Sequence, residues 1–176
     1  MKPQPGPMSH EARRMLRHTV ATLAYRAEKV LRDVPEGFAD VRLSSHSRTP
    51  LETLGHMCDL MGWAERMARG TYHWEAVPPA GWPETVDRFF TMLAAFDAAL
   101  GEAPPITFTA DIIFQGPVAD ALTHVGQLAL IRGTMTAAVR PESYARAEIA
   151  VGRVGRDQST DRAEFSGDAS KPKARG

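Results

Sequence analysis

The chain has 176 residues, and its 21 Lys and Arg residues balance its 21 Asp and Glu residues, so the formal net charge is zero. A neutral chain has no general attraction to phosphates, which argues against a nucleic-acid partner bound through bulk charge. A single cysteine excludes an intrachain disulfide framework, and no apolar run approaches the roughly 20 residues of a membrane span. The first residues contain no apolar signal region, so we expect one cytoplasmic domain without a membrane partner.

Prolines concentrate at the start of the chain, which predicts a flexible N-terminal lead over residues 1–8. From Ser9 the pattern becomes helical, because apolar residues recur at intervals of three and four positions. These residues are Leu16, Val20, Leu23, Ala27 and Val30. Proline and glycine then end the first helix within residues 33–37.

A second helix is predicted from Thr49 to about Gly70. Residues 49–52 form a capping box with proline at the first helical position, and glycine is typical of the position that follows a helix. A third helix begins at Trp82 and ends at Gly101. Its inward-facing residues are predicted to be Val86, Phe89, Phe90, Leu93, Phe96 and Leu100.

Residues 106–110 alternate briefly between apolar and polar types, which predicts a loop or a single short strand. Gly116 and the proline after it are expected to start a fourth helix that continues to about Ala138. Four amphipathic helices indicate an all-α four-helix bundle over residues 9–150. The irregular C-terminal tail, 151–176, has almost no apolar residue besides Phe165, so it is expected to be mobile or to lie over a partner subunit.

The fourth helix is apolar nearly all round, and we expect it to be the most buried helix of the bundle. Asp120 is its only acidic residue, and it shares one face with His124 and Gln127. A buried carboxylate pairs, binds a metal or becomes neutral. Asp120 and His124 therefore form either a structural contact or part of a metal site, and this helix alone leaves both open.

His56 on the second helix is the other candidate ligand. It lies roughly opposite the main apolar stripe of that helix, on a second apolar face that it shares with Trp63 and Met67. Taken alone, a histidine in such a place is more often a core residue than a ligand. His46 and His73 are expected to be solvent-exposed and to lie nearest the mouth of a cleft.

Two imidazoles and one carboxylate, from His56, His124 and Asp120, would leave open positions on a divalent metal, as in catalytic sites. This donor set suits zinc or nickel, and it also resembles the facial triad of non-haem iron enzymes. Gln127 is expected either to orient a water or a ligand from one turn away, or to form a hydrogen bond between helices. Cys58 lies on the main apolar stripe, which indicates a small core residue and not a nucleophile.

Two helical segments resemble the DinB-like (YfiT-like) superfamily of small metal-binding bundles. Residues 49–56, which end in Leu-Gly-His, are similar to its helix-2 signature. Residues 117–132 are similar to its last core helix, in which a metal-binding residue, three spacers and a histidine precede Gly-Gln. The closing segments 144–149 and 152–155 resemble the tail of one subgroup. The resemblance covers roughly residues 10–155, and the His-Val-Gly-Gln block at 124–127 is its most specific part.

The resemblance implies an up-down-down-up bundle, commonly a homodimer, that holds one divalent metal on three histidines. Two of these positions are His56 and His124, and Asp120 occupies the third, where a carboxylate is also a competent ligand. Members of the superfamily include thiol-dependent S-transferases and isomerases. The resemblance therefore favours such an enzyme, with a small-molecule substrate and a low-molecular-weight thiol as partner.

Two other functions stay open. One is a metal-dependent hydrolase, in which bound water attacks in place of a thiol. The other is a non-enzymatic dimeric bundle whose Asp–His–His cluster is structural or binds metal without turnover. In the enzyme hypotheses Trp63 and Met67 line the substrate pocket, although packing in the core or in a dimer interface is the more frequent role of such residues.

Overall fold

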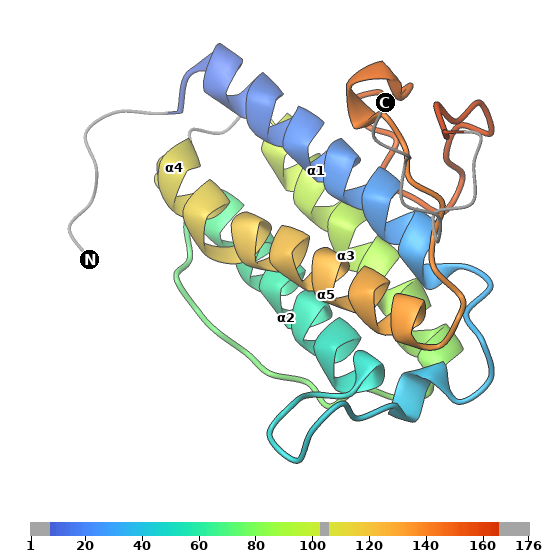
Figure 1. Ribbon diagram of the computed structural model, residues 1–176. Coiled ribbons are helices and arrows are strands. Elements are labelled where there is room, and N and C mark those ends of the chain that lie inside the picture. Colours follow the sequence, from blue (N-terminus) through green and yellow to red (C-terminus); the bar gives the residue numbers. More distant parts are fainter. Residues whose placement is uncertain (1–7, 103–105, 166–176) are drawn as a thin grey trace.

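The computed structural model describes residues 8–102 and 106–165, which form helices joined by loops (Figure 1). The predicted all-α class is confirmed, because these residues form no strand and contain a single isolated β-bridge, between Glu142 and Glu164. The long helices are α1 (His10–Leu31), α2 (Pro50–Ala68), α3 (Trp82–Gly101) and α5 (Ala119–Thr134). The short helical segments are η1 (Phe38–Asp40), α4 (Ala110–Ile113), η2 (Phe114–Val118) and η3 (Tyr144–Arg146).

The long helices pack side by side, and α1 and α2 each contact both α3 and α5 (Figure 1). The core lies between them, and the burial of its apolar side chains is the main driving force for folding. Every inward-facing residue predicted for α1 and α3 is buried. The largest fully buried side chains include Tyr25, Phe38, Phe89, Phe96, Leu54 and Met57. Within the described residues, no helix is long and apolar enough to cross a membrane.

Both ends of α2 follow the local signals in the sequence. At its start the Thr49 hydroxyl accepts from the Glu52 amide at 3.1 Å, and the Glu52 carboxylate accepts from the Thr49 amide at 2.8 Å. This capping box satisfies two amides that have no partner within the helix. At its end Gly70 adopts a φ of 90°, which costs glycine little, and the Thr71 amide donates to the Arg66 carbonyl at 2.8 Å. Local hydrogen bonds therefore set the length of α2.

The fourth helical stretch differs from the prediction at both ends. Helical structure begins at Ala110, where Thr109 caps α4, and continues through the π-helical turn η2 into α5, which ends at Thr134. Pro117 therefore lies inside a helical stretch and not at its start. The wider turn of a π-helix accommodates the missing N–H of proline and the bulk of its ring. Residues 106–109 form a loop, one of the two alternatives predicted for this segment.

The expectation that this would be the most buried helix was wrong, since a larger share of α2 is buried than of α5. The buried residues of α5 are Ala121, His124, Val125, Leu128, Ile131 and Arg132. Its opposite face is open to solvent, and Leu130 there is 66% exposed. A helix packed on its neighbours from one side leaves its outer residues exposed even where they are apolar.

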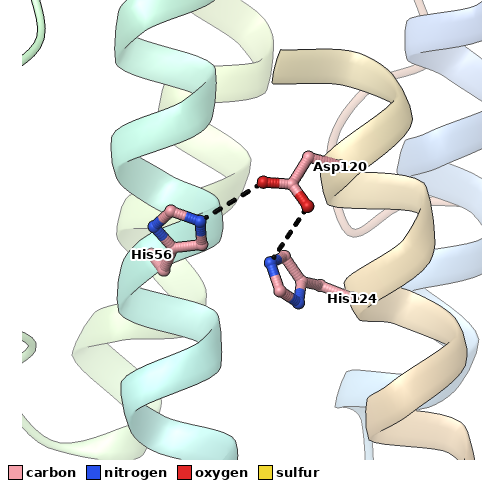
Figure 2. Close-up of side chains that lie close together, drawn as sticks. All are labelled: His56, Asp120 and His124. Atoms are coloured by element: carbon pink, nitrogen blue, oxygen red, sulfur yellow. Dashed lines mark hydrogen bonds and ion pairs between the residues drawn. The ribbon is translucent and has the colours of Figure 1, made fainter. Parts of the chain in front are cut away.

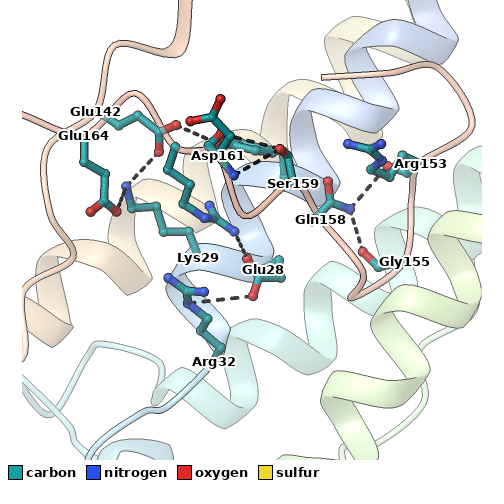
Figure 3. Close-up of polar contacts among 12 residues, drawn as sticks. Glu28, Lys29, Arg32, Glu142, Arg153, Gly155, Gln158, Ser159, Asp161 and Glu164 are labelled. Atoms are coloured by element: carbon teal, nitrogen blue, oxygen red, sulfur yellow. Dashed lines mark hydrogen bonds and ion pairs between the residues drawn. The ribbon is translucent and has the colours of Figure 1, made fainter. Parts of the chain in front are cut away.

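The segment after α5 returns to α1, to which ion pairs join it (Figure 3). The Nζ atom of Lys29 on α1 lies 2.7 Å from a carboxylate oxygen of Glu142 and 2.7 Å from one of Glu164. Arg162 pairs with Glu28, also on α1. Charged groups that are largely withdrawn from water thus hold this segment against the helix.

The apolar contact of the C-terminal segment differs from the expected one. Phe165 is 57% exposed, whereas Val154 is buried in the core. Phe165 follows Glu164, which pairs with Lys29, and its amide donates to the Pro141 carbonyl at 3.0 Å, so its backbone is held while its ring faces solvent. Residues 1–7 of the predicted lead and 166–176 of the predicted tail lie outside the described residues.

Candidate metal centre

Two helices bring three potential metal-binding side chains together (Figure 2). His56 projects from α2, whereas Asp120 and His124 project from successive turns of α5. The His56 Nε2 atom lies 3.4 Å from Asp120 Oδ2, and the His124 Nε2 atom lies 3.4 Å from Asp120 Oδ1. One donor atom from each residue lies within 4.8 Å of the other two. The three residues singled out in the sequence therefore form a group that could hold a metal ion.

Helical periodicity and helix packing together account for this convergence. Residues four apart lie one above the other on a helix, so Asp120 and His124 point to the same side of α5. The contact between α2 and α5 then brings His56 opposite them. The spacing of Asp120 and His124 can be read from the sequence, whereas the position of His56 opposite them depends on the tertiary fold.

The three side chains lie at the rim of the α2–α5 contact. The His124 side chain is mostly buried and that of His56 is partly buried, whereas the Asp120 side chain is 46% exposed. The prediction of a buried Asp120 was wrong, because the face of α5 on which this residue lies is only partly covered by α2. A half-exposed carboxylate leaves one side of the group open to a small molecule from solvent.

Gln127 fixes the orientation of the His124 ring. Its Oε1 atom lies 2.7 Å from His124 Nδ1, and a carbonyl oxygen only accepts, so Nδ1 is the nitrogen that donates its hydrogen. In the neutral ring Nε2 is then unprotonated, and this atom faces Asp120. The hydrogen bond between Gln127 and His124 lies within α5. Gln127 therefore does not form the hydrogen bond between helices that was one of its two predicted roles.

The donor atoms fit a divalent cation. With Nδ1 of neutral His124 protonated, Nε2 and the nearer Asp120 oxygen are two acceptors that face each other, which is unfavourable unless a cation lies between them. Either a proton on the imidazole or a metal ion meets this need. The His56 nitrogen lies 3.4 Å from Oδ2 of Asp120 and the His124 nitrogen lies 3.4 Å from Oδ1, so each imidazole faces one oxygen of the carboxylate. Imidazole nitrogen and carboxylate oxygen are donor types that divalent zinc accepts.

The surroundings of His56 favour the form of imidazole that binds metals. Burial and the positive charge of Arg48 lower the pKa of His56, and its hydrogen bond to Asp120 raises the pKa only in part. Because the net direction is downward from an ordinary value of 6.5, the ring is neutral near pH 7. A neutral imidazole has a free lone pair to offer to a metal.

An aromatic cluster lies beside His56. The centroid of the Trp74 ring lies 5.7 Å from that of the His56 ring and 5.8 Å from that of Trp63. Tyr72 packs against Trp63 with a centroid separation of 5.4 Å. Trp74 was missing from the predicted site, because it lies in the loop between α2 and α3, where no periodicity indicates the direction of a side chain.

The two predicted pocket residues lie in different surroundings. Trp63 packs at the contact of α2 with η2, where a Cβ atom added at Gly116 would lie 3.4 Å from its ring. Met67 is fully buried in the core, as is Cys58. Burial raises the pKa of the Cys58 thiol to about 12, so the thiol is protonated near neutral pH and is not a nucleophile.

A cavity of about 530 Å³ adjoins the group on the side of His124. The residues that line it come mainly from the loop before α2 and from α5: Leu43, His46, Ser47, Arg48, Thr53, His124, Gln127, Leu130 and Ile131. His46, expected near the mouth of a cleft, lines this cavity. His73, which was also expected near the mouth of a cleft, is exposed in the loop after α2 and does not line this cavity.

No family model, curated protein or solved structure matches this chain. The fold and the site define an all-helical protein with a His–Asp–His group that could hold a metal ion. Imidazole and carboxylate donors do not select a single metal, since zinc, nickel and iron all accept them.

Proposed function

We propose that this protein is a metal-dependent enzyme that binds one divalent ion through His56, Asp120 and His124. The observation that carries the proposal is the convergence of two imidazole nitrogens and one carboxylate from two separate helices. Three protein donors leave coordination positions open, which is typical of catalytic zinc sites and not of structural ones. Zinc and nickel are the ions we propose first, and iron is compatible with the same donors.

The proposal includes membership of the DinB-like superfamily, with its up-down-down-up bundle and its homodimeric assembly. Support comes from the all-helical fold and from the placement of one ligand on α2 and two on α5. These are the two helices whose sequences resemble the metal-binding helices of that superfamily. The reaction that the resemblance favours is a thiol-dependent S-transfer or isomerisation of a small molecule.

The side chains of the site have distinct roles in this proposal. A divalent ion held here would lower the pKa of a thiol or water bound beside it, which yields a nucleophile near neutral pH. Gln127 accepts the Nδ1 hydrogen of His124 and so keeps Nε2 turned toward Asp120. Asp120 presents one oxygen to each histidine and supplies the negative charge of the site. Trp74 packs on His56, with the ring centroids 5.7 Å apart.

The attacking thiol must come from a second molecule. Cys58 is the only cysteine of the chain, and it is fully buried in the core on α2. A protonated thiol without access to solvent cannot reach a substrate in the cavity beside His124. The proposed transferase therefore requires a low-molecular-weight thiol as cosubstrate.

The test is a turnover assay on the full chain loaded with zinc or nickel. A panel of small electrophiles is supplied with and without glutathione, mycothiol or bacillithiol. We expect turnover that depends on the thiol, is lost in His124→Ala and is retained in His18→Ala, a control on α1 outside the group. Turnover without thiol would contradict the transferase hypothesis and favour the hydrolase hypothesis. The absence of any turnover in the metal-loaded chain would contradict the enzyme and favour a binding protein.

A further inference from the structure

Arg48 is one of the residues that line the cavity beside His124, and none of the described residues in that lining has a carboxylate side chain. Among residues 8–102 and 106–165, neither a hydrogen bond nor an ion pair to Arg48 is found, although Arg42, six residues earlier, is paired with Glu52 at 2.9 Å. A cation that lines a cavity without a protein counter-ion is a natural partner for an anionic ligand.

The loop that carries Arg48 is fixed by its own hydrogen bonds. The Ser44 amide donates to the Ser47 hydroxyl at 3.0 Å, and the Ser47 amide donates to the Ser44 carbonyl at 3.1 Å. Arg42 donates to the Ser47 carbonyl, and the capping box of α2 begins at the residue after Arg48. The backbone at Arg48 is thus held between a closed turn and a capped helix, which limits the backbone entropy lost when a ligand binds.

Arg48 lines the same cavity as His124, a member of the metal-binding group. A small molecule that occupies the cavity can therefore contact both residues. The cavity also has an apolar part, because Leu43 and Leu130 are both more than half exposed and line it together with Ile131.

We propose that Arg48 determines specificity by binding a negatively charged group, such as a carboxylate or sulfonate, of a small molecule that occupies this cavity. The apolar part of the same molecule lies against Leu43 and Leu130, and its reacting end lies next to His124. The substrate class is thus a small amphipathic acid. The placement of the reacting end rests on the proposed function, whereas the pairing with Arg48 does not.

The test uses two probes that differ in charge, hexane-1-sulfonate and hexan-1-ol, and measures their dissociation constants by calorimetry. Sulfonate is a weak metal ligand, so its binding reports on Arg48 and not on a metal. Titrations use the full chain with and without zinc, and the metal content of each sample is measured. The variants are Arg48→Gln and, as a control with the same change of charge, Arg14→Gln, an exposed residue of α1 that does not line the cavity.

We expect the sulfonate to bind about tenfold more tightly than the alcohol, and we expect Arg48→Gln to remove this difference while Arg14→Gln retains it. Far-ultraviolet circular dichroism verifies that each variant is folded. Equal affinity of the two probes for the natural chain, or an unchanged preference in Arg48→Gln, would overturn the inference. A preference that depends on Arg48 in a chain that binds no zinc would support the inference and count against the proposed function.

Discussion

The Oε1 atom of Gln127 lies 2.7 Å from the Nδ1 atom of His124, one helical turn away on the same face of α5. This hydrogen bond fixes the tautomer of the ring and leaves Nε2 free to face Asp120. Metal-binding histidines ordinarily have such a partner on the second ring nitrogen, which orients the ring and raises its basicity. Through this hydrogen bond an exposed glutamine orients one of the three candidate metal ligands.

Replacement of Gln127 by alanine is expected to weaken zinc binding about 10- to 100-fold. The side chain is exposed, so the free energy of unfolding should change by less than about 0.5 kcal/mol. Competition with a chromophoric chelator measures the affinity. Gln115→Ala, at another exposed glutamine in η2, is the matched control and should bind zinc as the natural chain does.

The variant Gln127→Glu separates orientation of the ring from simple loss of a side chain. Glutamate retains an acceptor for the Nδ1 hydrogen of His124, so zinc affinity should recover to within a few-fold of that of the natural chain. Equal loss of affinity in Gln127→Ala and Gln127→Glu would contradict the role given to this hydrogen bond.

The ion pair between Lys29 on α1 and Glu142 in the C-terminal segment is buried, so removal of one partner alone should be costly. The Lys29 and Glu142 side chains are 2% and 0% exposed, and Lys29→Met would leave the Glu142 carboxylate buried with its main counter-ion removed. Such a change typically costs about 3–5 kcal/mol of unfolding free energy. Urea denaturation measures it. Arg69→Gln, which removes the surface pairs of Arg69 with Glu65 and Glu102, should cost no more than about 1 kcal/mol.

A similar loss of unfolding free energy in Lys29→Met and in Arg69→Gln would show that breaking the buried pair costs no more than breaking exposed pairs. We also expect the double variant Lys29→Met/Glu142→Leu to lose less unfolding free energy than Lys29→Met alone. The reason is that the double variant leaves no unpaired buried charge.

Stability at alkaline pH should depend on Tyr25. Burial and a hydrogen bond to Glu142 raise the pKa of this phenol from 10.0 to about 12. Because the folded chain holds the proton more tightly, the contribution is complete below pH 10 and is lost as the pH rises from 10 to about 12. Urea denaturation at a series of pH values should show this loss in the natural chain and a flatter profile in Tyr25→Phe. Identical alkaline profiles would contradict the assignment.

The end of α5 contains backbone strain that a single substitution should relieve. Thr136 has a φ of 60°, in the left-handed region that β-branched residues rarely adopt. Its position corresponds to the glycine of a Schellman motif, because the Ala137 amide donates to the Arg132 carbonyl at 3.1 Å. Thr136→Gly should therefore stabilise the protein by about 1 kcal/mol in urea denaturation.

Thr134→Gly, at the last residue of α5, is the control for that substitution. It has helical dihedral angles that threonine adopts without strain, so glycine there should destabilise by roughly 0.5–1 kcal/mol. A loss of stability in Thr136→Gly would mean that the threonine side chain makes a contact worth more than the strain.

Local signals predicted the helix ends that depend on local contacts. The capping box at Thr49 and the helix end at Gly101 agree with the structure because each is set by residues a few positions apart. Pro117 misled the prediction, since proline usually marks the start of a helix and here occurs in a π-helical turn. Whether a chain adopts such a turn depends on the helices packed against it, which no local pattern contains.

The part of the candidate site that lies on a single helix could be predicted from the sequence. The spacing of Asp120 and His124 placed both on one face of α5, whereas the place of His56 opposite them depends on how two helices pack. The exposure of Asp120 was mispredicted because composition does not specify which faces of a helix are covered. Trp74 and Arg48 lie in loops, where residue type alone does not predict position.

The metal content of freshly purified protein, prepared without a metal-affinity tag, tests the central claim most directly. Elemental analysis should find about one divalent ion per chain in the natural protein and in Asp111→Ala, an exposed acid of α4 outside the group. It should find no stoichiometric ion in Asp120→Ala. A natural chain without stoichiometric metal would contradict the account, and metal retained in Asp120→Ala would show that this carboxylate is not an essential ligand.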